Sequence, residues 1–197
     1  VGGERVYEFL NIATSARQIA LGGKVLTLID DVNQPLWNPS VINANLDNQL
    51  AVNYTSYLAG ISIGSVSYSK MISRHFGTMH AGITYLNYGT LIAADENGNE
   101  TGTFNASDVA LSVGYAYNFP ITNFYIVVNV KIVNAPIANF SSMGVASDVV
   151  ILYQNPYQPF VITFVVRNIG PQIKSFNFVI DRFPLYVSFG VYLTTVV

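Results

Sequence analysis

The apolar residues of this chain alternate with small or polar residues along many short segments, and this pattern constrains the fold most. In the segment 108–117, one face carries Val109, Leu111, Val113, Tyr115 and Tyr117, and the other carries Asp108, Ala110, Ser112, Gly114 and Ala116. Successive side chains of a β-strand point to opposite faces, so this segment is predicted to be a strand with one apolar and one small, polar side. Segments of about ten residues with this contrast are typical of a transmembrane β-barrel.

Charged residues are scarce in this chain. Only 10% of its 197 residues are charged and 51% are hydrophobic, whereas about a quarter of an average soluble domain is charged. A soluble β-sandwich binding module would need polar outer faces, which this composition hardly supplies. The net charge of −2 offers no basic surface for nucleic acid, and the absence of cysteine excludes disulfides and thiolate metal sites.

Two uncharged stretches, 109–130 and 149–166, are long enough to suggest membrane-spanning helices. Asn and Pro interrupt both of them, at 118–120 and at 154–159, and these residues favour turns over helix interiors. Each stretch therefore divides into two strands of about 9–11 residues, the length that crosses a bilayer. No signal peptide is visible at Val1, so an exported chain is expected to have lost it already.

The alternation predicts eight strands after residue 48. They cover 49–58, 61–71, 77–87, 107–117, 124–133, 142–152, 160–168 and 185–195, with a ninth possible near 25–29. Residues 1–48 combine turns and small residues with a short helical or extended element at 6–12, and we expect this N-terminal segment to lie inside or beneath a barrel formed by residues 49–197.

The longest polar connection is predicted at 93–105. Outer-membrane barrels have long extracellular loops and short periplasmic turns, so we expect this loop outside the cell. The candidate partner-binding residues in it are Asp95, Glu96, Asn97, Gly98, Asn99 and Glu100.

Several charged residues fall on the small-residue face of the predicted strands. Asp108 and Asp148 both lie there, which favours a polar lumen, or an ion pair with Arg167 or Lys131, over a charge at the membrane interface. Lys131 is expected in the lumen or near an interface. A lysine on the lipid face at the membrane midplane would cost about 2–4 kcal/mol.

The N-terminal segment leaves a second pairing open. Arg17 could pair with Asp30 or Asp31 inside the barrel, or it could equally be a surface charge.

No catalytic, metal or cofactor site is predicted. His75 and His80 lack further ligands at a metal-binding spacing, so His80 is expected to point into the lumen. The adjacent Asp30 and Asp31 could be an acid pair for hydrolysis, but a hydrogen-bonded turn is the better interpretation because the sequence places no second catalytic group beside them.

The chain also carries a set of motifs, most of them in its N-terminal half. They are Tyr7–Ile12, Thr14–Arg17, Ala20–Gly23, Asp30-Asp31, Trp37–Ser40, Asn87–Gly89, Ala94–Gly98, Gly102–Phe104 and Arg167–Gly170. As a set they resemble the PorQ family of outer-membrane β-barrels from the Bacteroidetes type IX secretion system, and more loosely its PorV relatives. The residues that carry the N-terminal motif are Ser15, Arg17, Gly22, Gly23, Asp30, Asp31, Asn38 and Pro39, to which we assign a structural role.

The resemblance implies a FadL-like barrel in the bacterial outer membrane. It implies a non-enzymatic anchor that holds a PorZ-like surface protein, in one complex with a PorU-like sortase and a PorV-like barrel. That complex processes secreted cargo and links it to anionic lipopolysaccharide. The alternative is a FadL-like transporter of long-chain or hydrophobic molecules. FadL-like barrels usually have about fourteen strands, so we expect this chain to be incomplete.

Overall fold

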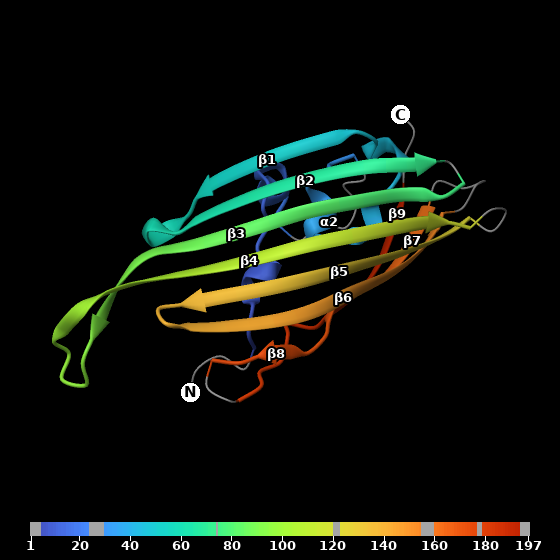
Figure 1. Cartoon of the computed structure of the whole chain (residues 1–197). Helices are drawn as coiled ribbons and strands as arrows, with labels where there is room; N and C mark the ends of the chain where they lie inside the picture. Colours follow the sequence, from blue (N-terminus) through green and yellow to red (C-terminus); the bar gives the residue numbers. More distant parts are fainter. Residues whose placement is uncertain are drawn as a thin grey trace.

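The structure is a computed structural model that describes residues 5–23, 30–73, 75–119, 123–154, 160–176 and 179–193. One large antiparallel β-sheet dominates it (Figure 1). Its strands are β1 (Gln49–Ser56), β2 (Ser62–Ser73), β3 (Gly77–Ala94), β4 (Glu100–Asn118), β5 (Phe124–Ile137), β6 (Phe140–Gln154), β7 (Phe160–Ile169), β8 (Gln172–Lys174) and β9 (Tyr186–Leu193).

The strands follow one another in sequence order across the sheet. The path runs from β1 to β7 and then to β9, with every neighbouring pair antiparallel, while the short β8 pairs with β6 beside it. The sheet is not closed, because β1 and β9 are its two edges among the described strands. The expected all-β antiparallel fold is therefore confirmed, whereas the described strands do not complete the expected barrel.

All eight predicted strands are present, but the longest predicted loop is wrong. Residues 93–105 are mostly strand, since β3 continues to Ala94 and β4 begins at Glu100, leaving only a five-residue turn at 95–99. Polar residues at these positions concealed the strand continuation, which Figure 1 shows as a hairpin extending beyond the other strands. The prediction missed β8, and its possible strand at 25–29 lies outside the described residues.

The two faces of the sheet differ as the alternation predicts. On β5, Val128 and Val130 are 44% and 43% exposed, whereas Asn129 and Lys131 between them are each 1% exposed. The same alternation of exposed and buried positions recurs along β3 and β4. The sheet thus exposes large apolar side chains on its outer face, while its inner face combines small and polar residues with buried apolar ones such as Val127 and Val150.

The inner face is covered by the N-terminal segment. This segment contains the short helices η1 (Glu8–Asn11), α1 (Ala16–Ala20), α2 (Gln34–Trp37), η2 (Pro39–Val41) and η3 (Ala44–Leu46), and η4 (Leu58–Gly60) follows β1. No described helix has both the length and the apolar character to span a membrane. The sheet curls around α2, since α2 packs on β3 and its Trp37 ring lies 6.1 Å from the Tyr186 ring of β9.

Glycines on the inner face let the covering residues approach the sheet closely. A Cβ atom at Gly82 of β3 would lie 2.5 Å from Leu36 Cδ2, and one at Gly114 of β4 would lie 2.6 Å from Ile42 Cδ1. On β6, a Cβ atom at Gly144 would lie 2.6 Å from the Phe183 ring. Glycines at these inner-face positions therefore leave room for large side chains that pack onto the sheet from other parts of the chain.

Candidate functional site

An ion pair is buried on the inner face. Lys131 Nζ on β5 lies 2.8 Å from Asp148 Oδ2 on β6, and the two side chains are 2% and 0% exposed. The strands bring them together because Asn129 is paired with Asp148 across the β5–β6 ladder, which places Lys131 one step along the same face. Of the two partners predicted for Asp148, Lys131 is the one that forms the ion pair.

Polar neighbours complete the coordination of this ion pair. Asn129 Nδ2 donates to Asp148 Oδ2 at 2.9 Å, and the backbone N–H of Asn168 donates to Asp148 Oδ1 at 2.9 Å. Lys131 Nζ donates to Asn168 Oδ1 at 2.9 Å. Burial of two charges is costly unless further hydrogen bonds satisfy them, and this network supplies those bonds.

Arg167 connects the sheet to the N-terminal segment. Its guanidinium carbon lies 4.7 Å from the centre of the Trp37 ring and 5.9 Å from that of Tyr186, within cation–π range. Its Nη2 donates to the carbonyl oxygen of Leu10 at 3.2 Å, and the residue is 1% exposed. Three chain segments therefore meet at this arginine, and the other candidate partner of Asp148 serves a different contact.

Two further contacts join the N-terminal segment to itself and to the sheet. Gln18 Nε2 donates to Gln34 Oε1 at 2.6 Å, and both side chains are fully buried. The Tyr7 hydroxyl is hydrogen-bonded to Ser142 Oγ on β6, and its ring packs 4.9 Å from the Phe183 ring. Burial is the largest influence on the Tyr7 hydroxyl and raises its pKa above the ordinary tyrosine value.

The residues of the predicted N-terminal motif shape local structure. Ser15 forms a capping box with Gln18 at the start of α1, and Gly22 and Gly23 follow that helix with φ angles of 88° and 80°. Asn38 accepts from the backbone N–H of Ser40 at 3.2 Å, with Pro39 in the first position of η2. These positions are helix ends and turns that only a capping residue, glycine or proline fits well.

The acidic residues of the motif are also structural. Arg17 pairs with Asp30 at 3.1 Å, and because their side chains are 50% and 62% exposed this is a surface pair. The sequence left open whether Arg17 lies inside the barrel or at the surface, and the structure places it at the surface. Asp31 Oδ1 accepts from the backbone and side-chain amides of Asn33, each at 2.9 Å, which is a hydrogen-bonded turn.

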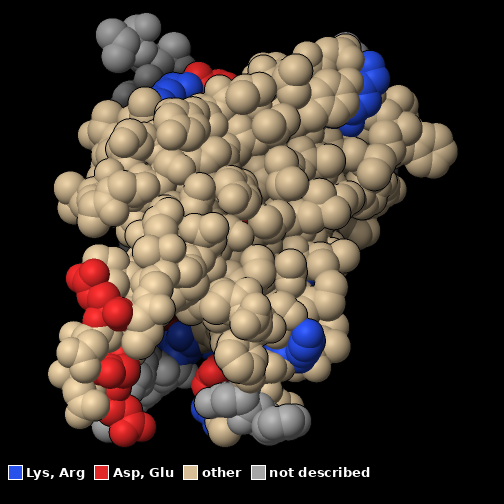
Figure 2. All heavy atoms as spheres, turned by 60° about the vertical axis from the view of Figure 1, so that its left-hand side comes forward, with Lys and Arg blue, Asp and Glu red and all other residues tan. Residues whose placement is uncertain are grey.

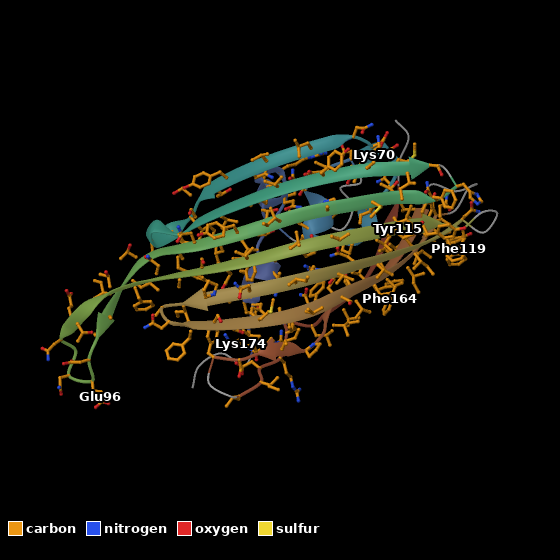
Figure 3. All side chains as sticks on the ribbon, in the orientation of Figure 1. Lys70, Glu96, Tyr115, Phe119, Phe164 and Lys174 are labelled. Atoms are coloured by element: carbon orange, nitrogen blue, oxygen red, sulfur yellow. The ribbon has the colours of Figure 1, made fainter. Side chains whose placement is uncertain are left out.

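The predicted partner-binding residues occupy the tip of the β3–β4 hairpin. Asp95 Oδ1 accepts from the backbone N–H groups of Asn97 and Asn99, and its Oδ2 accepts from Asn99 Nδ2 at 3.0 Å. The side-chain bond from Asn99 is the largest of the influences that lower the pKa of Asp95. Glu96 lies at the extreme end (Figure 3), and positions 95–100 are all exposed.

His80 lies on the inner face, as predicted, and is 1% exposed. His75 lies apart from it in the exposed turn between β2 and β3. Within the described ranges, no group of three or more His, Cys, Asp or Glu side chains could hold a metal ion.

A pocket of about 450 Å³ opens at the end of the inner face opposite the hairpin tip. It is lined by residues 40–45 of the N-terminal segment and by the ends of β2, β3, β4, β5 and β6. Its lining includes Asn43, Asn45, Asn118 and Gln154 beside Val41 and Ile42. The pocket is therefore mixed in character, with amides as well as apolar groups.

Comparison with known proteins gives no match: no protein-family model fits this chain, and no curated protein is significantly similar to it.

Proposed function

We propose that the sheet is part of the wall of an outer-membrane β-barrel and that the chain is a non-enzymatic anchor for a surface protein. The observation that carries the proposal is the arrangement of the two faces, with large apolar side chains outside and a packed interior that contains a buried ion pair. The exposed apolar residues occur on every long strand of the sheet. Water would disfavour such an outer face, whereas lipid would not.

The distribution of charge supports a membrane location. Figure 2 shows a broad surface without charged side chains, with Lys, Arg, Asp and Glu gathered toward its margins. On β5 the exposed apolar residues run from Phe124 to Ile132, which is about 26 Å along a strand. Strands of outer-membrane barrels are tilted by about 40°, so this length is about 20 Å across the bilayer and fills most of an apolar band about 25 Å tall.

Aromatic side chains gather at one end of this band. Tyr117 and Phe119 at the end of β4 have ring centres 5.0 Å apart, and Phe124 and Tyr153 on the next two strands are also 5.0 Å apart. Phe160 continues the row at 6.4 Å from Tyr153. Rows of aromatic residues at membrane–water interfaces are typical of outer-membrane barrels. This row supports an interface at the end opposite the hairpin tip (Figure 3).

The packed interior favours an anchor over a transporter. Leu36 and Ile42 pack against the inner-face glycines Gly82 and Gly114. Arg167 stacks on Trp37 and donates a hydrogen bond to the Leu10 carbonyl oxygen. A FadL-like conduit for hydrophobic molecules would require these contacts to separate. We therefore propose that residues 5–23 and 30–48 fill the interior permanently.

The hairpin tip is the proposed contact for a surface partner. It extends furthest from the aromatic end, and its exposed Asp95, Glu96 and Glu100 form an acidic tip. We propose a PorZ-like partner there, with a PorU-like sortase and a PorV-like barrel in the same complex. The sequence motifs at 7–40 support this assignment.

The test is to purify the full-length protein in mild detergent and identify the accompanying proteins by mass spectrometry. In one variant, residues 92–103 are replaced by Asn-Gly, which retains the Leu91–Phe104 pair and closes a two-residue hairpin. We expect this variant to remain in the outer membrane but to lose its partner. The control replaces the β5–β6 turn, residues 138–139, with the same Asn-Gly.

Three outcomes would contradict parts of this proposal. Unchanged partner recovery by the shortened hairpin would show that the tip is not the contact. Extraction of the unaltered protein into detergent-free buffer would contradict the membrane location. A lone protein that retains bound hydrophobic molecules would favour the transporter.

A further inference from the structure

A second pocket lies on the outer face of the sheet, where β3, β4 and β5 leave the apolar band. Its volume is about 420 Å³. It is lined by Tyr85, Asn87, Gly89, Thr90, Asn105, Ala106, Ser107, Pro136 and Ala138. None of these residues takes part in the interior network or in the hairpin tip.

Two local irregularities make this pocket. On one side of β4, the pairing with β3 shifts between Asn87 and Thr90, where β3 has one residue more than β4 and Gly89 adopts a φ of 73°. Such a β-bulge bends its strand and breaks the ladder, and bulges are often found beside functional sites.

On the other side of β4, the ladder to β5 is also interrupted. Paired residues stop at Val109–Asn134 and resume only at Ala106–Ile137. Pro136 lies in this gap and has no backbone N–H to contribute. The β4–β5 register is the same on both sides of this gap, so the strands miss pairs there without a bulge, and the pocket lies where this gap and the β3 bulge flank β4.

The lining chemistry is polar and neutral. Asn87 uses its side-chain oxygen to accept from the backbone N–H of Gly89 at 2.9 Å, and Asn105 Oδ1 accepts from the Thr90 hydroxyl at 3.4 Å. Among the described residues, the side-chain nitrogens of both asparagines and the hydroxyl of Ser107 form no hydrogen bond to protein groups. These groups are free to bind a ligand.

The position of the pocket suits a membrane lipid. Pro136 is twelve residues from Phe124 along β5, or about 40 Å, and a strand tilt of about 40° would reduce this to about 30 Å across the bilayer. That is about the thickness of the hydrocarbon core. If the aromatic row at Phe124 marks one interface, the pocket lies at the other.

We infer that this pocket binds the neutral sugar headgroup of a membrane glycolipid, with the acyl chains lying along the apolar outer face below it. Amides and a hydroxyl match the donors and acceptors of a sugar, and Tyr85 gives an aromatic surface at the pocket edge. No Lys or Arg is among the lining residues, so the pocket lacks the cations that bind phosphate. The inference rests on the proposed membrane location.

The experiment places the full-length protein in lipid nanodiscs that contain equal amounts of glucosyl-diacylglycerol, phosphatidylglycerol and phosphatidylethanolamine with identical acyl chains. Native mass spectrometry then measures which lipids remain bound. We expect the glucosyl lipid to be enriched over both phospholipids. Asn105→Leu should lower this enrichment about fivefold to tenfold, because the free amide donor is lost together with the carbonyl oxygen that accepts from Thr90.

Two further variants keep the result interpretable. Ser107→Ala removes one hydroxyl without altering any hydrogen bond between described residues, so it should fold normally and reduce the enrichment less than Asn105→Leu. Asn118→Leu, at the other end of β4, is the matched control and should leave the enrichment unchanged.

Each remaining outcome is decisive. Equal retention of all three lipids, or preferential retention of a phospholipid, would overturn the sugar assignment while leaving the membrane location intact. Failure to enter nanodiscs would overturn the membrane location. In that case, saturation-transfer NMR with methyl glucoside tests the pocket separately, and the absence of transfer that depends on Asn105 would overturn the sugar site as well.

Discussion

The inner and outer faces of the same strands differ in which side chains are buried and which are exposed. On β5, the inward Asn129 and Lys131 are almost completely buried, while the outward Val128 and Val130 are nearly half exposed. A soluble sheet protein usually has the reverse arrangement, with apolar residues inside. The difference teaches that the two faces have separate packing requirements: the inner face must pair its buried polar groups, whereas the outer face leaves apolar side chains uncovered by the rest of the chain, and the two can be tested separately.

The largest effect is expected at the buried ion pair. Asp148→Leu removes the carboxylate and leaves Lys131 buried without its partner. We expect a loss of about 3–5 kcal/mol in the free energy of unfolding, measured by urea denaturation in lipid vesicles. The double variant Lys131→Met/Asp148→Leu should recover most of it, because no unpaired lysine then remains.

The exposed pair Arg17–Asp30 is the control for this experiment. Asp30→Leu should change the free energy of unfolding by no more than about 1 kcal/mol, because the side chains of Arg17 and Asp30 are 50% and 62% exposed. Equal losses from Asp148→Leu and Asp30→Leu would show that the interior is far more hydrated than its packing indicates.

The second prediction addresses the outer face. Val130→Arg places a charge in the middle of the apolar band, and we expect it to destabilise the protein in lipid vesicles by about 2–4 kcal/mol. Phe140→Arg, at the rim beside the β5–β6 turn, is the matched control with an expected cost of about 0–1 kcal/mol. Equal tolerance of arginine at both positions would mean that lipid does not cover the outer face.

These face assignments are the part of the fold that the sequence predicts best. Alternation alone places Val109 and Leu111 outside and Ala110 and Ser112 inside, because a strand has a period of two. It also restricts Asp148 to the inner face, although it leaves Lys131 and Arg167 as equal partners. The choice between them depends on the β5–β6 register, which periodicity does not give.

The remaining features could not be predicted from local patterns. The contact of Trp37 with Arg167 and the seating of Ile42 on Gly114 join residues far apart in the chain. The only sequence signal was the recurrence of glycine on inner positions, which indicates a close approach without identifying the partner. The hairpin at 93–105 was missed because its polar composition resembles a loop.

The third prediction tests the close packing of side chains against the inner-face glycines. Gly144→Ala adds a methyl group between two rings, 2.6 Å from Phe183 Cζ and 2.9 Å from Tyr7 Cε2. We expect overpacking to lower the free energy of unfolding by about 1–3 kcal/mol, and Phe183→Leu in the same chain to restore part of it.

Gly64→Ala is the control for this substitution. Its added methyl group would meet only the Asn53 carbonyl oxygen, at 3.9 Å, so it should be tolerated. Destabilisation by Gly64→Ala as large as that by Gly144→Ala would show that backbone freedom, rather than the rings, explains the inner glycines.

The smallest effect is expected at the hairpin tip and depends on pH. The hydrogen bonds from Asn99 and Asn97 lower the pKa of Asp95 in the folded hairpin, so this carboxylate is held more tightly there than in the unfolded chain. Its stabilisation is complete above the unfolded pKa and is lost as the pH falls through the lower, folded value. Amide hydrogen exchange at Asn97 and Asn99, corrected for intrinsic rates, should therefore accelerate on acidification.

In Asp95→Ala, protection at these amides should already be reduced at neutral pH and should not change on acidification. Protection that is unaffected by acid in the unaltered protein would show that the turn backbone, not the carboxylate, holds the tip.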